Sequence, residues 1–173
     1  GIPATIIMPK NSPKVKLRAT RDTYGARVVI CENTIESRQQ TCQKIQENEG
    51  QTLIHPYDND QIIAGAGTSA LEFLTEIPHL DIIMAPVGGG GLLTGTSIAS
   101  KGIKPSIRVI AGEPQRADDA FRSLQSGVIK INKHPNTIAD GLRTNLCSRT
   151  FKIIQENVER ISFSLILASG KYS

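Results

Sequence analysis

The sequence contains no tryptophan, and aromatic residues make up only 4% of its 173 residues. Aliphatic side chains must therefore form the core, which a chain of this length can build. Cysteine is also scarce, since only Cys31, Cys42 and Cys147 occur and no two of them form a CxxC pair. Their odd number and their spacing argue against a disulfide framework or a zinc site, and they favour a reducing, cytoplasmic compartment.

Dense runs of one charge are absent as well, although the formal net charge is +4. The basic residues Lys14, Lys16, Arg18 and Arg21 are spaced apart, which is typical of a solvated helix face rather than of a nucleic-acid surface. No signal peptide is evident. Residues 82–100 carry no charge, but their proline and four consecutive glycines favour a buried strand, loop and helix over a membrane span. We therefore expect neither a nucleic-acid partner nor a membrane partner.

Short apolar runs rich in Ile and Val alternate with helical patterns along the chain. The runs that predict strands cover residues 4–8, 27–31, 52–54, 81–87 and 107–112. Strands that are apolar throughout are typical of parallel sheets covered on both faces, and their regular spacing is that of successive βα units. The expected fold class is therefore α/β, with three layers: a twisted, mostly parallel sheet and helices on both of its faces.

Local signals mark where the helices begin and end. Ser12 before Pro13 predicts one helix start, Asn33 with Glu36 has the spacing of a capping box, and Gly50 would end the second helix. A single apolar helix face is predicted from the spacing of five residues, Ala70, Leu71, Phe73, Leu74 and Ile77. Weaker patterns suggest a helix over 151–158 and a strand over 161–168.

Four consecutive glycines, Gly88–Gly91, follow the predicted strand 81–87 and precede a helix that opens at about Leu92. Glycines let the backbone approach a ligand closely, and free N–H groups at a helix start form a cradle for an anion. The motif is neither a Walker A loop nor the usual dinucleotide fingerprint. It predicts a phosphate-binding loop; the alternative is a tight crossover from strand to helix.

Two other groups of polar residues have both a functional and a structural interpretation. Glu113 and Asp119 flank a turn after the strand 107–112, where hard oxygen ligands suit Mg²⁺ or Ca²⁺. Acidic residues that stabilise a helix dipole are the simpler explanation from this pattern alone. His55, which precedes Pro56, is interpreted as a packed or hydrogen-bonded residue rather than a catalyst. Gly65 and Gly67 indicate backbone packing near a site or a crowded helix.

Taken in order, six motifs resemble the serine racemase and threonine dehydratase family of fold-type II pyridoxal-phosphate enzymes. The motifs are residues 1–4, 55–58, 64–68, 86–92, 113–119 and 137–141. The resemblance covers residues 1–163 and implies part of the small domain and part of the large domain of such an enzyme. Residues 164–173 look like a divergent tail.

The resemblance assigns roles to individual residues and implies pyridoxal 5′-phosphate as cofactor. It places the cofactor at six positions: Gly88, Gly89, Gly90, Gly91, Leu92 and Gly141. It also implies a Mg²⁺ or Ca²⁺ site made by Glu113, Asp119 and the carbonyl of Ala117, which favours the racemase branch. Serine or threonine as substrate, and a homodimer in the full-length family, follow from the same resemblance.

The departures from the family concern the chemistry itself. The Ser-Phe-Lys-x-Arg segment that carries the family's Schiff-base lysine is not found, and neither is the Ser-x-Gly-Asn-His-Gly loop that binds the substrate carboxylate. Downstream, Ser169-Gly170 only faintly matches the family's Ser-Gly-Gly-Asn segment, and Ala66 replaces a usual glutamine. No residue of this chain is therefore assigned a catalytic role.

The preferred hypothesis is a fragment of a serine/threonine racemase-dehydratase that is inactive alone. The alternative is a non-enzymatic module that binds a phosphate ligand or regulates full-length relatives. A cysteine synthase relative would share the fold type, but the motifs at 55–58 and 113–119 argue against it.

Overall fold

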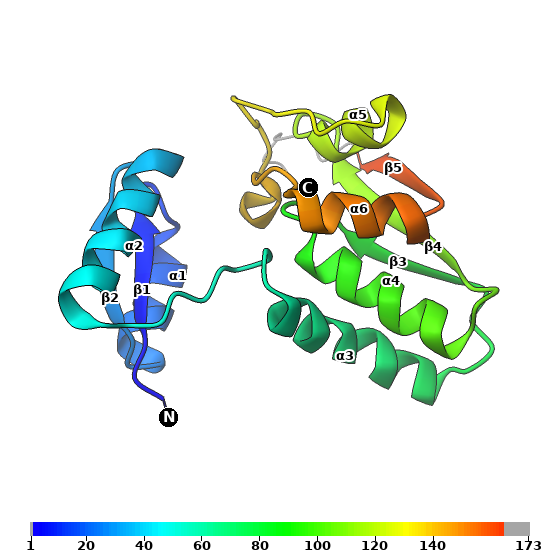
Figure 1. Cartoon of the computed structure of the whole chain (residues 1–173), viewed down its shortest axis with the longest axis horizontal. Helices are drawn as coiled ribbons and strands as arrows, with labels where there is room; N and C mark the ends of the chain where they lie inside the picture. Colours follow the sequence, from blue (N-terminus) through cyan, green and yellow to red (C-terminus); the bar gives the residue numbers. More distant parts are fainter. Residues whose placement is uncertain (1, 165–173) are drawn as a thin grey trace, which may run out of the picture. The chain divides into compact units, whose positions relative to one another are not determined.

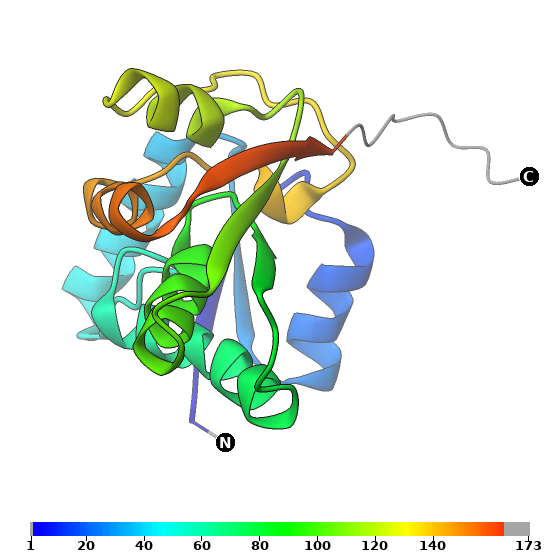
Figure 2. The ribbon, with the colours of Figure 1, turned by 90° about the vertical axis from the view of Figure 1, so that its right-hand side faces the viewer.

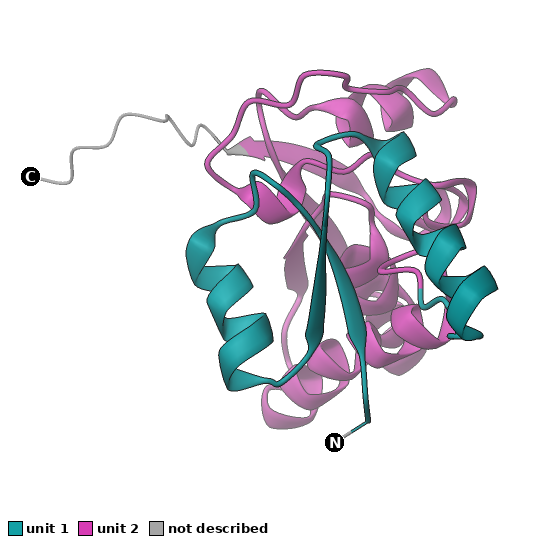
Figure 3. Ribbon diagram, turned by 90° about the vertical axis from the view of Figure 1, so that its left-hand side faces the viewer, with its two compact units in different colours: residues 1–54 teal, residues 55–173 magenta. Residues whose placement is uncertain are grey.

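The computed structural model describes residues 2–164, and the chain divides into two compact units, residues 1–54 and 55–173 (Figure 1, Figure 3). Each unit is built from helices and parallel strands, so the predicted α/β class is confirmed. The strands form one sheet in each unit rather than a single sheet. The divergent tail predicted at 164–173 lies outside the described residues, apart from the backbone of Ser164.

The first unit contains a two-stranded parallel sheet and helical segments. Its elements are β1 (Thr5–Pro9), α1 (Lys14–Arg18), the π-helical turn η1 (Ala19–Thr23), β2 (Arg27–Cys31) and α2 (Ile35–Glu49). The two strands pair in register from Thr5 opposite Arg27 to Pro9 opposite Cys31. The strand predicted at 52–54 is wrong, because this three-residue run is irregular chain and pairs with none of the strands among residues 2–164.

The start of α1 differs by one residue from the prediction. Pro13 occupies the N-cap with extended dihedral angles, while the N–H of Ser12 donates to the carbonyl of Pro9 at 2.9 Å and closes a turn. Proline lacks an N–H and has a restricted φ, so it suits the boundary itself. The four basic residues at 14, 16, 18 and 21 are exposed, as expected for a solvated face.

The N-cap of α2 is Thr34, one residue after the predicted Asn33, and the reciprocal bond of a capping box is not formed, because Oγ of Ser37 accepts from the N–H of Glu32. The side chain of Thr34 accepts a hydrogen bond from the N–H of Ser37 at 3.1 Å. Asn33 cannot take this role because its Oδ1 accepts from the N–H of Asn11 at 3.0 Å. Gly50 ends the helix in the left-handed region, with φ of 64°, as predicted.

The second unit is built around a three-stranded parallel sheet in the order β3-β4-β5 (Figure 2). Its elements are α3 (Asp60–Glu76), β3 (Ile82–Pro86), α4 (Gly91–Ile103), β4 (Arg108–Pro114), α5 (Asp119–Ser126), the 3-10 turn η2 (Asp140–Leu142), α6 (Ser148–Asn157) and β5 (Arg160–Ser164). The core lies between one face of this sheet and the helices, and Val109, Leu93 and Ile154 are fully buried in it. On β3, Ile83 and Ala85 face this core while Met84 is exposed.

The apolar face predicted for α3 is only partly correct. The buried side of α3 follows Ile63, Gly67, Ala70 and Leu74, whereas Leu71 and Phe73 are 49% and 45% exposed. The buried side is centred on glycine and alanine because the backbone of α4 approaches there. A prediction based on the spacing of large apolar residues does not identify a face made of glycine and alanine.

The closest approach of α3 and α4 is made by two glycines. A Cβ placed on Gly95 would lie 2.3 Å from the carbonyl oxygen of Ile63 and 2.6 Å from the nitrogen of Gly67. A Cβ on Gly67 would lie 2.9 Å from the carbonyl oxygen of Gly95. The glycine at 67 therefore belongs to a crowded pair of helices, one of the two explanations open from the sequence.

None of the described helices combines the length and the apolar character needed to cross a membrane.

Replacing Gly95 by alanine should destabilise the protein by about 2 kcal/mol or more, because the added Cβ meets backbone atoms that cannot rotate away. Gly102 lies on the same helix, and a Cβ added there would have no atom within 4 Å. Gly102→Ala should therefore be neutral or stabilise by up to about 1 kcal/mol through helix propensity. Urea unfolding followed by circular dichroism measures both, and equal effects of the two substitutions would contradict the close helix approach.

Candidate functional site

The four glycines connect the C-terminal end of β3 to the N-terminus of α4. The strand ends at Pro86 and α4 begins at Gly91, one residue before the expected start. Gly90 is the N-cap residue and has a φ of 91°, a conformation that residues with a Cβ rarely adopt. The sequence thus needs glycine at this position to reverse the chain from strand into helix.

The backbone N–H groups of this turn are available to an acceptor. The first intrahelical hydrogen bond of α4 runs from the N–H of Thr94 to the carbonyl of Gly90, at 2.8 Å. Within residues 2–164, no acceptor is found for the N–H groups of residues 88–93. Unpaired N–H groups at a helix start carry partial positive charge, so this turn can hold an anion such as a phosphate.

Neighbouring segments fill the directions in which side chains would project from the loop. A Cβ on Gly88 would lie 2.9 Å from the carbonyl oxygen of Gly141, which brings two of the predicted cofactor positions together. A Cβ on Gly89 would lie 2.4 Å from the ring of Tyr57, and one on Gly90 would lie 2.8 Å from Cβ of Thr150. Packing within the protein therefore requires glycine at these positions, whether or not a ligand also does. The sequence placed Tyr57 in the motif 55–58 without giving it a role, and nothing in the sequence pattern singled out Thr150.

The two predicted carboxylate ligands are buried at the end of β4 and the start of α5. Glu113 lies on β4, and its two carboxylate oxygens accept from the N–H groups of Ala120 and Phe121, each at 2.8 Å. Asp119 is the first residue of α5, and its Oδ2 is buried without a hydrogen-bond partner among the described residues. Ala117 is buried in the turn between them, so all three predicted residues belong to one strand-turn-helix segment.

Burial controls the ionisation of both carboxyl groups. Loss of hydration raises the pKa of Glu113 to about 7, although its two backbone hydrogen bonds act in the opposite direction. Loss of hydration also raises the pKa of Asp119 to about 6. A nearby cation would stabilise both charged forms. Groups of three or more His, Cys, Asp or Glu side chains able to hold a metal do not occur among residues 2–164, so any cation here depends on these two carboxylates and on backbone oxygens.

An open cavity of about 240 Å³ adjoins both the glycine turn and the carboxylate segment. It is lined by the C-terminal ends of β3 and β4 and by η2: Met84, Ala85, Pro86, Gly112, Glu113, Pro114 and Leu142. Pro86 leads into the glycines, and Glu113 is one of the two carboxylates. In parallel α/β sheets, ligands bind at the carboxyl ends of the strands, and this cavity lies at that edge.

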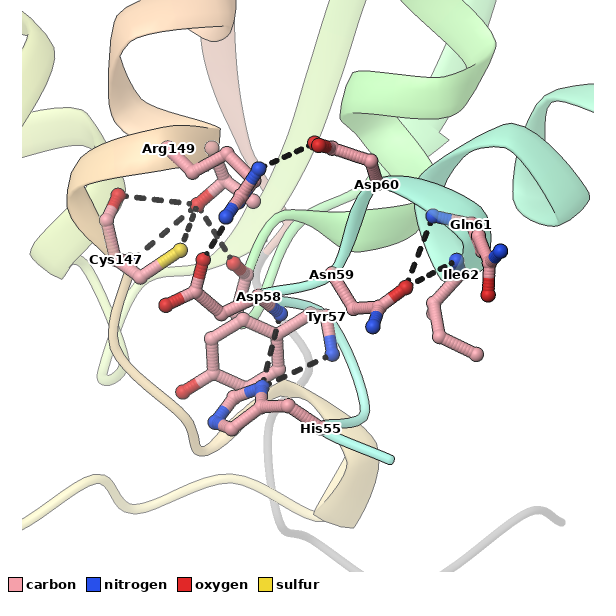
Figure 4. Close-up of polar contacts among 11 residues, drawn as sticks. His55, Tyr57, Asp58, Asn59, Asp60, Gln61, Ile62, Cys147 and Arg149 are labelled. Carbon is pink, nitrogen blue, oxygen red and sulfur yellow. Dashed lines mark hydrogen bonds and ion pairs between the residues drawn. The ribbon is translucent and has the colours of Figure 1, made fainter. Parts of the chain in front are cut away.

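Residues 55–60 are attached to the start of α6 by an ion-pair network (Figure 4). Nε of Arg149 donates to Asp58 at 2.8 Å, and its guanidinium also pairs with Asp60. This hydrogen bond from Arg149 holds the pKa of Asp58 below its ordinary value. His55 is hydrogen-bonded, as expected: its Nδ1 accepts from the N–H of Asp58 at 2.8 Å and from that of Tyr57 at 3.3 Å.

Two lysines near the end of α4 have structural partners. Nζ of Lys101 donates to the carbonyl of Ile107 at 2.6 Å, and Nζ of Lys104 donates to the carbonyl of Leu80 at 2.7 Å. Both lysines lie at the C-terminal end of the helix whose N-terminus carries the glycines. Neither is placed to react with a ligand held at the glycine turn.

Comparison with known proteins gives consistent results. Residues 1–163 match the pyridoxal-phosphate dependent enzyme family. A serine racemase of Dictyostelium discoideum is 48% identical over 160 residues, which cover 90% of this chain and 48% of that protein. The structure of maize serine racemase superposes with a TM-score of 0.91 at 40% identity, over 95% of this chain and 50% of that one. The processed form of threonine deaminase isoform 2 from Solanum lycopersicum gives a TM-score of 0.84 at 30% identity, over 94% of this chain and 48% of that one.

The chain thus spans about half the length of the relatives that it matches. The match nevertheless covers nearly all of this chain, and the resemblance seen in the six sequence motifs is confirmed. On this basis the chain belongs to the pyridoxal-phosphate dependent enzyme family, together with serine racemases and threonine deaminases.

Proposed function

We propose that this chain supplies the phosphate cradle and a divalent-cation site of a pyridoxal-phosphate enzyme that racemises serine or dehydrates serine or threonine, and that it has no turnover by itself. The observation that carries the proposal is the row of unpaired N–H groups at residues 88–93, next to the cavity at the strand ends. A cytoplasmic location and a homodimer belong to the same proposal.

The residues present fit the phosphate of the cofactor. The N–H groups of the glycine turn would hold the phosphate. Gly141, which the family resemblance assigns to the cofactor site, is close to this turn, since a Cβ on Gly88 would lie 2.9 Å from its carbonyl oxygen. Leu92, the second residue of α4, contributes its N–H while its side chain stays partly exposed. When bound, pyridoxal phosphate supplies an electron sink that makes the Cα proton of an amino acid removable.

The residues also fit a hard divalent cation. Mg²⁺ and Ca²⁺ take carboxylate, carbonyl and water oxygens, and Glu113, Asp119 and the carbonyl of Ala117 provide such ligands on one short segment. The unpartnered Oδ2 of Asp119 is the specific support, since a buried polar atom without a partner is costly unless something binds it. The cation would stabilise the loop structurally and take no part in the reaction.

The first prediction concerns the glycine turn. Titration with inorganic phosphate should shift the amide signals of residues 88–93 in a saturable way, because these N–H groups lack acceptors within residues 2–164. Gly127 is a matched control, since it is also a glycine with positive φ, at 71°, but it ends α5 instead of preceding a helix. If the protein remains folded and signals 88–93 do not move more than that of Gly127, the turn is only a crossover.

The second prediction concerns turnover. Mixed with pyridoxal phosphate, the 173-residue chain should neither racemise serine nor release ammonia from serine or threonine, because the sequence has no Ser-Phe-Lys-x-Arg segment. Chiral chromatography and an ammonia assay measure the two reactions. A covalent adduct of pyridoxal phosphate at one unique lysine that borohydride can reduce, accompanied by turnover, would refute this. The inactive fragment and the non-enzymatic module both predict phosphate binding without turnover. Turnover that appears when the chain is extended by a stretch containing the Ser-Phe-Lys-x-Arg segment would favour the fragment.

The third prediction is a pH dependence of stability. Because the pKa values of Glu113 and Asp119 are raised to about 7 and about 6, the folded chain retains protons that the unfolded chain has released. Without divalent cations, the free energy of unfolding should therefore fall by several kcal/mol as the pH rises from about 4 to about 7. Millimolar Mg²⁺ or Ca²⁺ should reverse the fall.

The matched variants are Glu113→Gln and Glu159→Gln. The first should show a smaller fall in stability with rising pH and no response to metal. Near pH 4 it should be about 1–3 kcal/mol less stable than the wild type, because the amide nitrogen of Gln cannot accept one of the two N–H groups that Glu113 binds. Glu159 pairs with Arg108 at 2.7 Å on the surface, so its substitution should cost about 0–1 kcal/mol and preserve both effects. Metal stabilisation that is unchanged in Glu113→Gln would exclude this site.

A further inference from the structure

We infer that Tyr57 is a positioning residue of the glycine turn: its ring, held in place by Arg149 at the start of α6, aligns the N–H groups that receive the phosphate. This inference rests on the proposed function of the turn as a phosphate cradle. Arg149 pairs with Asp58 and Asp60 beside Tyr57, although they are far apart in sequence (Figure 4). Tyr57 and Thr150 both lie against the glycines.

Tyr57 lies against two of the four glycines, with its ring over Gly89 and its Cβ and Cα beside Gly91. A Cβ on Gly89 would lie 2.4 Å from Cδ1 and Cε1 of the ring, and a Cβ on Gly91 would lie 2.8 Å from Cβ of Tyr57. Glycine samples many backbone conformations, so a run of four would by itself be poorly ordered before a ligand binds. The ring therefore excludes those conformations in which Gly89 moves towards residue 57.

The peptide bond after Gly89 is also held from the side of α6. The hydroxyl of Thr150 donates to the carbonyl oxygen of Gly89 at 2.9 Å, and Cβ of Thr150 lies 2.8 Å from the Cβ position of Gly90. A peptide unit is planar and trans, so a fixed carbonyl at Gly89 also fixes the direction of the N–H of Gly90. Tyr57 and Thr150 therefore hold one peptide plane of the cradle between them.

The position of Tyr57 is in turn determined by contacts of its own segment. His55 accepts the N–H groups of Tyr57 and Asp58 at 3.3 and 2.8 Å, which shapes the turn, and its ring meets that of Tyr57 edge-on with centroids 4.7 Å apart. Arg149 ties Asp58 and Asp60 to the first turn of α6. Because Arg149 and Thr150 are adjacent, one helix turn holds both the segment that carries Tyr57 and the glycine carbonyl.

The ring should matter more than the ion pairs. The side chains of Arg149 and Asp58 are 42% and 41% exposed, and that of Asp60 is 80% exposed, so solvent screens their attraction. Arg149 also offsets two carboxylates that would oppose a bound anion. Substituting Arg149 by alanine should therefore weaken phosphate binding about two- to fivefold, less than removal of the ring.

The test is the affinity of the 173-residue chain for inorganic phosphate, measured from the amide shifts of residues 88–93. Tyr57→Ala should weaken binding about tenfold, whereas Tyr57→Phe, which keeps the ring, should stay within about twofold of the wild type. Leu74→Ala is the control for general destabilisation, because Leu74 is buried in the core near the other end of α3. It should lower the unfolding midpoint and leave the phosphate affinity unchanged.

Binding by Tyr57→Ala within about twofold of the wild type, or an equal loss in Leu74→Ala, would overturn the inference. If the wild type binds no phosphate, the proposed function of the turn is wrong. Hydrogen exchange then tests separately whether Tyr57 orders the turn. The amide of Thr94, which donates to the carbonyl of Gly90 at 2.8 Å, should exchange faster in Tyr57→Ala than in Leu74→Ala at matched stability. Equal exchange in the two variants would show that Tyr57 does not order the turn. If Tyr57→Ala does not fold, Tyr57→Leu, which retains apolar bulk without a ring, replaces it and should lie between Phe and Ala.

Discussion

The reversal of the chain from β3 into α4 is the constraint on which the second unit depends. Within four glycines the backbone leaves the sheet, takes a positive φ at Gly90 and begins a helix. Tyr57, Thr150 and Gly141 approach so closely that a Cβ on the neighbouring glycine would collide with each of them. The same absence of side chains lets three distant segments pack around the turn and leaves its N–H groups unpaired within residues 2–164, so packing and anion binding have one physical origin.

The parallel sheet brings the anion cradle and the carboxylate segment to the same edge. Both follow the carboxyl ends of neighbouring strands, because β3 and β4 run in the same direction and are in register from Ile82 opposite Arg108 to Pro86 opposite Gly112. The two sites have opposite electrostatic character. The glycine turn offers partial positive charge to an anion, whereas the buried Glu113 and Asp119 have raised pKa values that a cation would lower.

Agreement between sequence and structure was best where the local pattern was strong. The Ile- and Val-rich runs at 27–31, 81–87 and 107–112 form strands β2, β3 and β4, since such runs are stable only when buried in a sheet. Prediction failed where a local signal had competing partners. Asn33 looked like a helix cap but is engaged by Asn11, and residues 52–54 had strand composition but no strand beside them among the described residues.

By itself, the sequence determined the family, because six motifs in a fixed order are specific even when each alone is weak, and it located the glycine turn and the carboxylate segment on named residues. Only the tertiary structure decided what surrounds them. That Tyr57 and Thr150 lie against Gly89, and that α3 turns its glycine rather than Leu71 towards α4, depends on contacts between residues far apart in the chain. Such contacts depend on how the helices and strands pack, and they cannot be predicted from the local periodicity of the sequence.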